Sequence, residues 1–137
     1  MLKGISPLLS PELLATLCTM GHGDTIVLGD SNFPCASLGP KVIRADGIGG
    51  CELLAAIMPL FELDAYVEHP LQMMAPVPGD HLDAEYVANV TRIAQNEPGY
   101  LERFAFYEAA KHAFAIVQTG ETRAYGNILL TKGPIKP

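Results

Sequence analysis

A histidine between two glycines is the residue of this sequence best placed to do chemistry. His22 lies in the stretch MGHGD, which follows a helical pattern and precedes a short apolar segment. An imidazole gains and loses a proton near neutral pH, and flanking glycines remove side chains that would block a ligand. We therefore predict that His22 is a catalytic acid–base residue. The alternative is a histidine that caps the preceding helix through its charge.

A second group of residues could form a polar ligand site. Asp30 ends the apolar segment that follows His22, and this segment spans roughly 20 Å if it is extended. A site that uses both residues must therefore be closed by a loop that folds back or by another subunit. Near the carboxyl end, Tyr125, Gly126 and Asn127 offer a phenol, an open backbone and a carboxamide in consecutive positions. This mixture suits a sugar, because it supplies donors and acceptors without strong charge.

Each of these residues also has a simpler interpretation. Asp30 lies in the cluster GDSN, where a carboxylate commonly forms a turn. Tyr125 could be an exposed tyrosine at a strand entry. Arg103 precedes a helical pattern and could fork onto hydroxyls or a carboxylate, or it could form a surface ion pair with Glu102 or Glu108.

The histidines and cysteines do not have metal-binding spacing. No pair of histidines matches H-x-x-x-H or H-E-x-x-H, so we predict no metal site. We expect His69 and His81 to face solvent, and His112 to be structural because it falls inside an apolar helical pattern. The three cysteines are odd in number, lack C-x-x-C spacing and follow no secretory signal, which predicts reduced thiols and a cytoplasmic location.

Proline and glycine punctuation divides the chain into alternating elements. Ser10 and Pro11 have the residue types of a helix cap and first turn, and Gly21 is a natural helix stop. We expect helices near residues 11–20, 50–58, 83–95 and 104–112, and strands at 25–28, 42–44, 71–75, 114–117 and 127–130. The last two strands are expected to pair around a turn at residues 119–120. This pattern predicts one α/β domain over residues 1–137, with helices layered on a mixed, largely buried sheet.

Composition restricts the partners. Fifteen acidic and nine basic residues give a net charge of −6, which argues against nucleic acid or an anionic membrane surface as the partner. No apolar run approaches the eighteen or so residues that span a bilayer. Since 49% of the residues are hydrophobic and 18% are charged, we expect part of the surface to cover subunit interfaces.

Several stretches together resemble the L-fucose mutarotase and D-ribose pyranase family. They cover nearly the whole chain, and the combination is far more specific than any single piece. The stretches are residues 1–14, 20–24, 32–34, 42–47, 59–64, 103–108 and 119–127. Residues 96–102 depart from the pattern, because they are shorter than the strand-like segment of bacterial fucose enzymes.

The resemblance implies a fold and an assembly. It implies an α/β/α layered domain with a mixed, largely parallel sheet, as in the ribose pyranase fold. It also implies a ring-shaped homo-oligomer, a decamer, in which each site is shared between neighbouring subunits. It favours the fucose branch, because Arg103 stands where the ribose branch has histidine and Gly126 where ribose enzymes often have alanine.

The resemblance also implies residue roles. His22 is expected to be the proton donor, and the sugar is expected to contact Asp30, Arg103, Tyr125, Gly126 and Asn127. The implied activity is interconversion of the α and β anomers of L-fucose by ring opening and closure, which needs no cofactor or metal. His22 would protonate the ring oxygen, and Asp30 or Tyr125 would act at the anomeric hydroxyl. The alternatives are a D-ribose pyranase and a non-catalytic sugar-binding module.

Overall fold

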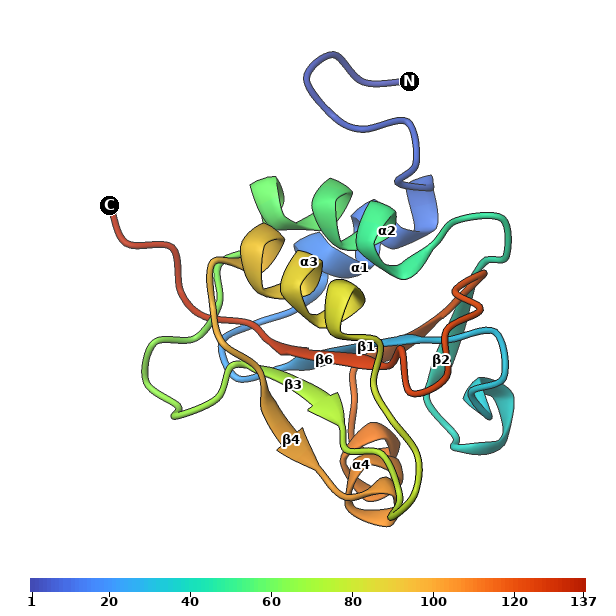
Figure 1. Cartoon of the computed structure of the whole chain (residues 1–137). Coiled ribbons are helices and arrows are strands. Elements are labelled where there is room, and N and C mark those ends of the chain that lie inside the picture. Colours follow the sequence, from blue (N-terminus) through green and yellow to red (C-terminus); the bar gives the residue numbers. More distant parts are fainter.

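Six strands form one mixed sheet in the order β2-β5-β1-β6-β3-β4 (Figure 1). The computed structural model describes all residues, 1–137. The strands are β1 (Thr25–Gly29), β2 (Lys41–Ala45), β3 (Leu71–Met74), β4 (Gly99–Leu101), β5 (Ala115–Thr119) and β6 (Ile128–Thr131). Five strands run parallel, and β6 runs antiparallel to its neighbours β1 and β3. The expected mixed, largely parallel sheet is therefore confirmed.

Helices cover both faces of this sheet. They are α1 (Pro11–Thr19), α2 (Gly50–Ile57), α3 (Ala84–Ala94) and α4 (Arg103–Lys111), with two 3₁₀ turns, η1 (Cys35–Ser37) and η2 (Met58–Leu60). Figure 1 shows α1, α2 and α3 together on one face and α4 on the other. The architecture is the α/β/α layering that the resemblance implies.

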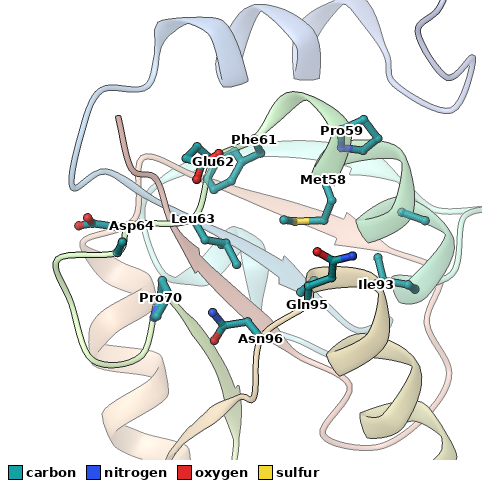
Figure 2. Close-up of a pocket in the computed structure, with 13 residues that line it drawn as sticks. Met58, Pro59, Phe61, Glu62, Leu63, Asp64, Pro70, Ile93, Gln95 and Asn96 are labelled. Atoms are coloured by element: carbon teal, nitrogen blue, oxygen red, sulfur yellow. The ribbon is translucent and has the colours of Figure 1, made fainter. Parts of the chain in front are cut away.

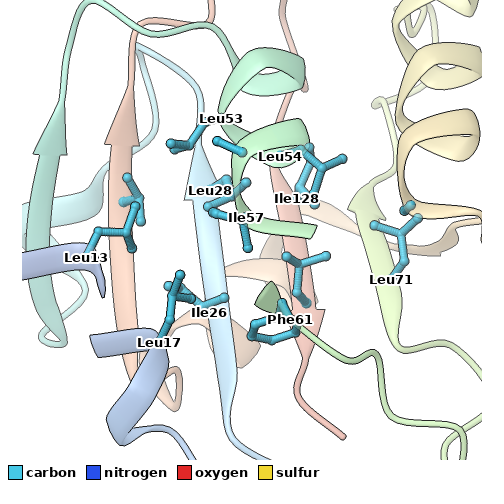
Figure 3. Close-up of a cluster of buried hydrophobic side chains, with 14 of the residues drawn as sticks. Leu13, Leu17, Ile26, Leu28, Leu53, Leu54, Ile57, Phe61, Leu71 and Ile128 are labelled. Atoms are coloured by element: carbon cyan, nitrogen blue, oxygen red, sulfur yellow. The ribbon is translucent and has the colours of Figure 1, made fainter. Parts of the chain in front are cut away.

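The core lies in two layers because β1 is buried on both faces. Ile26 and Leu28 point toward the larger hydrophobic cluster, and Val27 points toward the smaller one. Figure 3 shows the larger cluster, in which side chains from α1 and α2 pack over β1 and β6. Such near-continuous apolar strands are typical of sheets covered by helices on both sides.

Side chains cap the amino-terminal ends of three helices by accepting hydrogen bonds from the first turn. The Ser10 hydroxyl accepts a hydrogen bond from the Leu13 N–H at 3.1 Å, and Asp83 does the same for Tyr86 at 3.1 Å. The carboxylate of Glu102 accepts from two N–H groups in the first turn of α4. These contacts satisfy backbone donors that have no partner within the helix.

The expected pairing of the last two strands is wrong. β1 lies between β5 and β6 and pairs with both. The segment after β5 does not turn back: Gly120 donates its N–H to the Ile48 carbonyl, and the Glu121 carbonyl accepts from Ser31. Gly120 therefore follows the end of β5 and packs against the loop of Ile48. Residues 121–127 then connect β5 to β6 along the edge of the sheet.

Two smaller expectations also differ from the structure. His112 is not within a helix but at the end of α4, and 80% of its side chain is exposed. Residues 99–101, which were not expected to be a strand, form β4 by pairing with β3. Such a short edge strand has no sequence signal of its own, because its pairing partner decides it. None of the helices combines the length and the apolar character that a membrane span requires.

A buried hydrogen bond connects α3 to the segment before β6. The Tyr86 hydroxyl donates to the Gly126 carbonyl at 2.9 Å, and the Tyr86 side chain is almost completely buried. Removing this hydroxyl leaves a buried carbonyl without its donor. We expect Tyr86→Phe to lower the free energy of unfolding by about 1–2 kcal/mol. Tyr100→Phe, at a half-exposed tyrosine, is the matched control, expected to stay within about 0.5 kcal/mol in urea unfolding. Equal effects of the two changes would contradict this account.

Candidate functional site

The topology gathers polar residues at the carboxyl edge of the parallel strands. Asp30 follows β1, Asp80 lies in the loop after β3, and Arg103 follows β4. Tyr125 precedes β6, which runs in the opposite direction, so its start lies at the same edge. Loops at the carboxyl ends of strands are where open α/β sheets commonly bind ligands.

These residues surround a hollow of about 260 Å³. Typical drug-sized pockets have about 300–1,000 Å³, so this one suits a small polar molecule. It is lined by Asp30, Asn32, Phe33, Met74, Asp80, Arg103, Tyr107, Ala124, Tyr125 and Asn127. Four of the five residues predicted to bind the ligand therefore line one hollow, whereas Gly126 is buried behind it with its carbonyl bound by Tyr86.

Asp30 is fixed through its backbone. Its N–H donates to the Asn127 side-chain oxygen at 2.8 Å, and its carbonyl accepts from the buried Gln118 amide at 2.7 Å. The carboxylate accepts the Asn32 N–H at 3.0 Å, which is the turn contact that the sequence also predicts. One carboxylate can do both, because an ionised carboxylate accepts several hydrogen bonds and the second oxygen is left for a ligand.

Burial raises the pKa of Asp30, and nearby backbone N–H groups oppose this effect. The carboxylate of Glu121 raises the pKa further by repulsion. Burial has the largest effect on this pKa, because it removes water that would stabilise the charged carboxylate. A hydrogen-bond donor next to Asp30 would replace part of that stabilisation. A hydroxyl of a bound ligand would be such a donor.

Tyr125 has a left-handed backbone conformation, with a φ of 60°. Such values are uncommon for residues other than glycine and cluster at functional sites. The next residue must be small: a Cβ on Gly126 would come within 2.9 Å of the Glu121 side chain and 3.0 Å of the Arg123 carbonyl oxygen. The tight bend places the phenol at the hollow, where its hydroxyl donates to the Asp80 carboxylate at 2.5 Å.

Arg103 does not form the surface ion pair that was its alternative interpretation. Its guanidinium lies over the ring of Phe104 at 5.2 Å and over the ring of Tyr107 at 5.6 Å. Its Nε also donates to the Tyr107 hydroxyl at 3.3 Å. Aromatic stacking holds the stem while the remaining N–H donors stay exposed at the hollow, ready for a hydroxyl.

His22 lies at the opposite edge of the sheet. It precedes β1, whereas Asp30 follows it. It does not cap α1: Lys132 does so, because its ammonium group donates to the carbonyls of Leu17 and Met20. No residue of the hollow contacts His22. The structure therefore separates the predicted proton donor from the predicted ligand-binding residues.

His22 has a carboxylate partner that the sequence did not single out. Its Nε2 is 3.1 Å from Oδ1 of Asp64, and only 3% of the Asp64 side chain is exposed. Asp64 is oriented by the Tyr66 N–H, which donates to the same oxygen at 3.0 Å. A carboxylate only accepts, so Nε2 carries the hydrogen and Nδ1 remains free for a ligand. About half of the His22 side chain is exposed, so the ring can reach a molecule outside this chain.

A larger hollow of about 610 Å³ lies next to this pair (Figure 2). It is bounded by η2, the segment 61–65, Pro70 and the end of α3. Figure 2 shows the Asp64 carboxylate pointing away from this hollow, while Gln95 and Asn96 point into it. Since neither His22 nor any predicted ligand-binding residue lines it, this hollow is not the candidate site.

Asp64 and Asp80 are two acidic residues for which the sequence predicts no role. Asp64 is one of two acidic residues in the mostly apolar stretch PLFELDA, and only the structure shows that Asp64 is buried while Glu62 is exposed. Asp80 follows Pro78 and Gly79, a pair typical of a tight turn that presents the next residue. Neither signal names the partner, because both partners lie more than 40 positions away.

The geometry defines an α/β protein with a small polar ligand site at the sheet edge and a histidine–aspartate pair at the other edge. The model of the RbsD / FucU transport protein family matches residues 3–135. The chain belongs to this family.

Named relatives are similar over nearly the whole length. An L-fucose mutarotase of Actinobacillus pleuropneumoniae serotype 5b is 54% identical, covering 99% of this chain and all of the relative. An L-fucose mutarotase of Glaesserella parasuis serovar 5 is 57% identical, covering 97% of this chain and 95% of the relative.

Solved structures agree in fold. The fucose mutarotase of Streptococcus pneumoniae, in complex with L-fucose, has a TM-score of 0.94 and 44% identity and covers 98% of this chain and all of its own. The RbsD of Bacillus subtilis, complexed with D-ribose, has a TM-score of 0.78 but only 21% identity, over 99% of this chain and all of its own. The second likeness shows a shared fold.

The contact with Asp64 predicts the tautomer of His22. In the neutral ring we expect the hydrogen on Nε2, which ¹⁵N shifts of labelled histidine measure directly. In Asp64→Asn the amide can offer either an oxygen or an N–H, so we expect the preference for Nε2–H to be lost. The exposed His81 ring is the internal control and should not change. The same His22 tautomer in both proteins would contradict the proposed orienting role of Asp64.

Proposed function

We propose that this protein interconverts the α and β anomers of L-fucose by opening and reclosing the pyranose ring. The observation that carries the proposal is the convergence of Asp30, Arg103, Tyr125 and Asn127 on one small polar hollow. The full-length relatives named L-fucose mutarotase, at 54–57% identity, support the choice of sugar. Residues 1–137 would act as one mutarotase domain.

The hollow supplies groups for binding a sugar. The second carboxylate oxygen of Asp30 would accept a sugar hydroxyl, and the exposed N–H groups of Arg103 would donate to others. The Asn127 oxygen is already used by Asp30, and its amide nitrogen donates to Met74 Sδ at 3.9 Å, so the second amide N–H is the one that would face the sugar. Gly126 would act through its conformation, because its lack of a side chain allows the tight packing that holds Tyr125 and Asn127 at the hollow.

Ring opening needs one proton delivered and one removed. The ring oxygen must gain a proton as its bond to the anomeric carbon breaks, and the anomeric hydroxyl must lose one. His22 would deliver the first proton, oriented by Asp64 as aspartate orients histidine in catalytic triads. Tyr125 or Asp30 would act at the anomeric hydroxyl. The hemiacetal itself changes no oxidation state, so the chemistry requires no redox cofactor.

One copy of the chain does not complete this site. His22 and the hollow flank opposite ends of β1, so the His22 that serves a given hollow would come from a second copy. We propose a ring-shaped homo-oligomer, a decamer, with each site shared between neighbours. Large apolar side chains at the surface, including Tyr66 beside His22 and Phe104 beside Arg103, support the presence of such contacts.

Three cysteines without a disulfide support a cytoplasmic location.

The role of His22 is tested by magnetisation transfer between the two anomeric protons of L-fucose. We expect His22→Ala to slow the catalysed exchange by about 10²- to 10⁴-fold, because the ring oxygen loses its proton donor. His81→Ala is the matched control and should leave exchange unchanged, since His81 is exposed and lies outside the site. Equal exchange in His22→Ala and the parent protein would remove His22 from the mechanism.

The same measurement separates the alternatives. A D-ribose pyranase would accelerate ribose ring interconversion more than fucose anomer exchange. A non-catalytic sugar-binding module would show sugar-induced chemical shifts with no acceleration of either reaction.

A shared site predicts complementation between two inactive variants. His22→Ala keeps the hollow, and Tyr125→Phe keeps the histidine. When the two are co-expressed in equal amounts and mix at random, about a quarter of the sites combine an intact histidine with an intact hollow. We expect exchange to return to about a quarter of the parent rate, whereas the two variants purified separately and assayed together without subunit exchange stay inactive. Co-expressed variants that remain inactive, although they form mixed oligomers, would contradict the shared site.

A further inference from the structure

A rigid turn after β3 presents a carboxylate to the phenol in the hollow. The Asp80 N–H donates to the Val77 carbonyl at 3.0 Å, which closes a four-residue turn. Pro78 occupies its second position, and Gly79, with a φ of 94°, occupies its third. This combination is that of a type II turn, in which proline fixes one dihedral angle and glycine accepts the positive φ. The position of Asp80 is therefore set by the local sequence.

Tyr125 is fixed from the other side. Its backbone has the strained left-handed conformation described above, and Gly126 after it is held by the buried Tyr86 hydroxyl. Two independently rigid segments, 45 positions apart, thus bring the Tyr125 hydroxyl and the Asp80 carboxylate to 2.5 Å. A hydrogen bond this short and charge-assisted is strong and directional. Because the phenol donates its hydrogen to Asp80, the oxygen lone pairs of Tyr125 are left to accept from a ligand.

The two candidates for the anomeric hydroxyl differ in their surroundings. One carboxylate oxygen of Asp30 accepts an N–H of its own turn, and no side chain stands beside the carboxylate as a proton acceptor among its hydrogen-bond partners. Tyr125 instead has a partner that can take its proton. The hydrogen bond to Asp80 raises the pKa of Tyr125, so the phenol keeps its proton and is not present as the phenolate that could act as a base. It can receive a proton only if its own proton moves on.

We propose that Asp80 is a positioning residue for ring opening, which acts through Tyr125 by accepting the phenolic proton. The inference rests on the proposed function. The anomeric O–H gives its proton to the Tyr125 oxygen while the phenolic proton passes to Asp80. The O–H electron pair forms the carbonyl at the anomeric carbon, and the bond from that carbon to the ring oxygen breaks. The ring oxygen takes a proton from the protonated His22 of a second copy.

The step is balanced and reversible. The sugar loses one proton and gains one, Asp80 becomes a carboxylic acid, and His22 becomes neutral. After rotation about the bond between the first two carbons of the open chain, both protons return and the ring closes on the other face. No oxidant, reductant or further reactant takes part.

Asp80→Asn tests this role while it keeps the shape of the turn. The amide oxygen can still accept the phenolic hydrogen bond, so Tyr125 stays in place, but the amide cannot take a proton. For anomer exchange of L-fucose we expect kcat to fall by about 10²-fold and KM to change by less than about threefold. Glu85→Gln removes a nearby exposed acid and is the control for charge, with no change expected. Asp80→Glu restores an acceptor and should recover at least about tenfold over Asp80→Asn.

A double variant separates the relay from independent effects. If Asp80 acts through Tyr125, Asp80→Asn combined with Tyr125→Phe should be no slower than Tyr125→Phe alone, within about twofold. The relay would be overturned if the losses of the two single variants multiply in the double variant. It would also be overturned if kcat of Asp80→Asn stays within about threefold of the parent, or if Asp80→Asn raises KM alone. No catalysed exchange by the parent protein would remove the proposed function and the relay with it. Undiminished exchange in Asp80→Asn would remove the relay alone.

Discussion

The length of β1 is the constraint on which the rest of the structure depends. Its five residues rise about 17 Å between the loop of His22 and the turn of Asp30. β1 is the inner strand that joins β5 to β6, so it can neither shorten nor bend without loss of pairing on both sides. A proton donor and a ligand site fixed to its two ends cannot meet in one chain. If both belong to one site, as we propose, two copies of the chain must supply its two halves.

The antiparallel direction of β6 decides what the ligand half-site contains. In a fully parallel sheet the residues before the last strand would lie at the amino edge, with His22. Because β6 is reversed, Tyr125 and Asn127 lie at the carboxyl edge, where Asp30 follows β1 and Arg103 follows β4. The buried Asn127 carboxamide then binds the Asp30 backbone and joins the start of β6 to the end of β1.

Local signals in the sequence predict the helices and strands, but they do not predict which strands pair or which distant side chains contact one another. The Ser10 cap and the apolar strands are set by neighbours a few positions away, and these predictions are confirmed. The expected glycine stop is less accurate, because α1 ends at Thr19 with Met20 as its cap, before Gly21. The pairing of β5 and β6 was predicted wrongly, because a turn signal cannot reveal that β1 inserts between them. The acids Asp64 and Asp80 escaped notice for the same reason. Each contacts an aromatic side chain that lies far away in the sequence, His22 for Asp64 and Tyr125 for Asp80.

The two half-sites differ in rigidity, and this difference bears on how the protein would work. At the hollow, backbone and side-chain hydrogen bonds fix Asp30 and Tyr125 before any ligand arrives, which is the preorganisation that catalysis requires. At the other edge, His22 has one buried anchor, Asp64, and a half-exposed ring on a glycine-flanked loop. In the proposed shared site, the final distance between proton donor and sugar would be set by how two copies dock. Substitutions at the contact between copies would therefore change kcat through that distance, even where they touch neither the sugar nor the hollow.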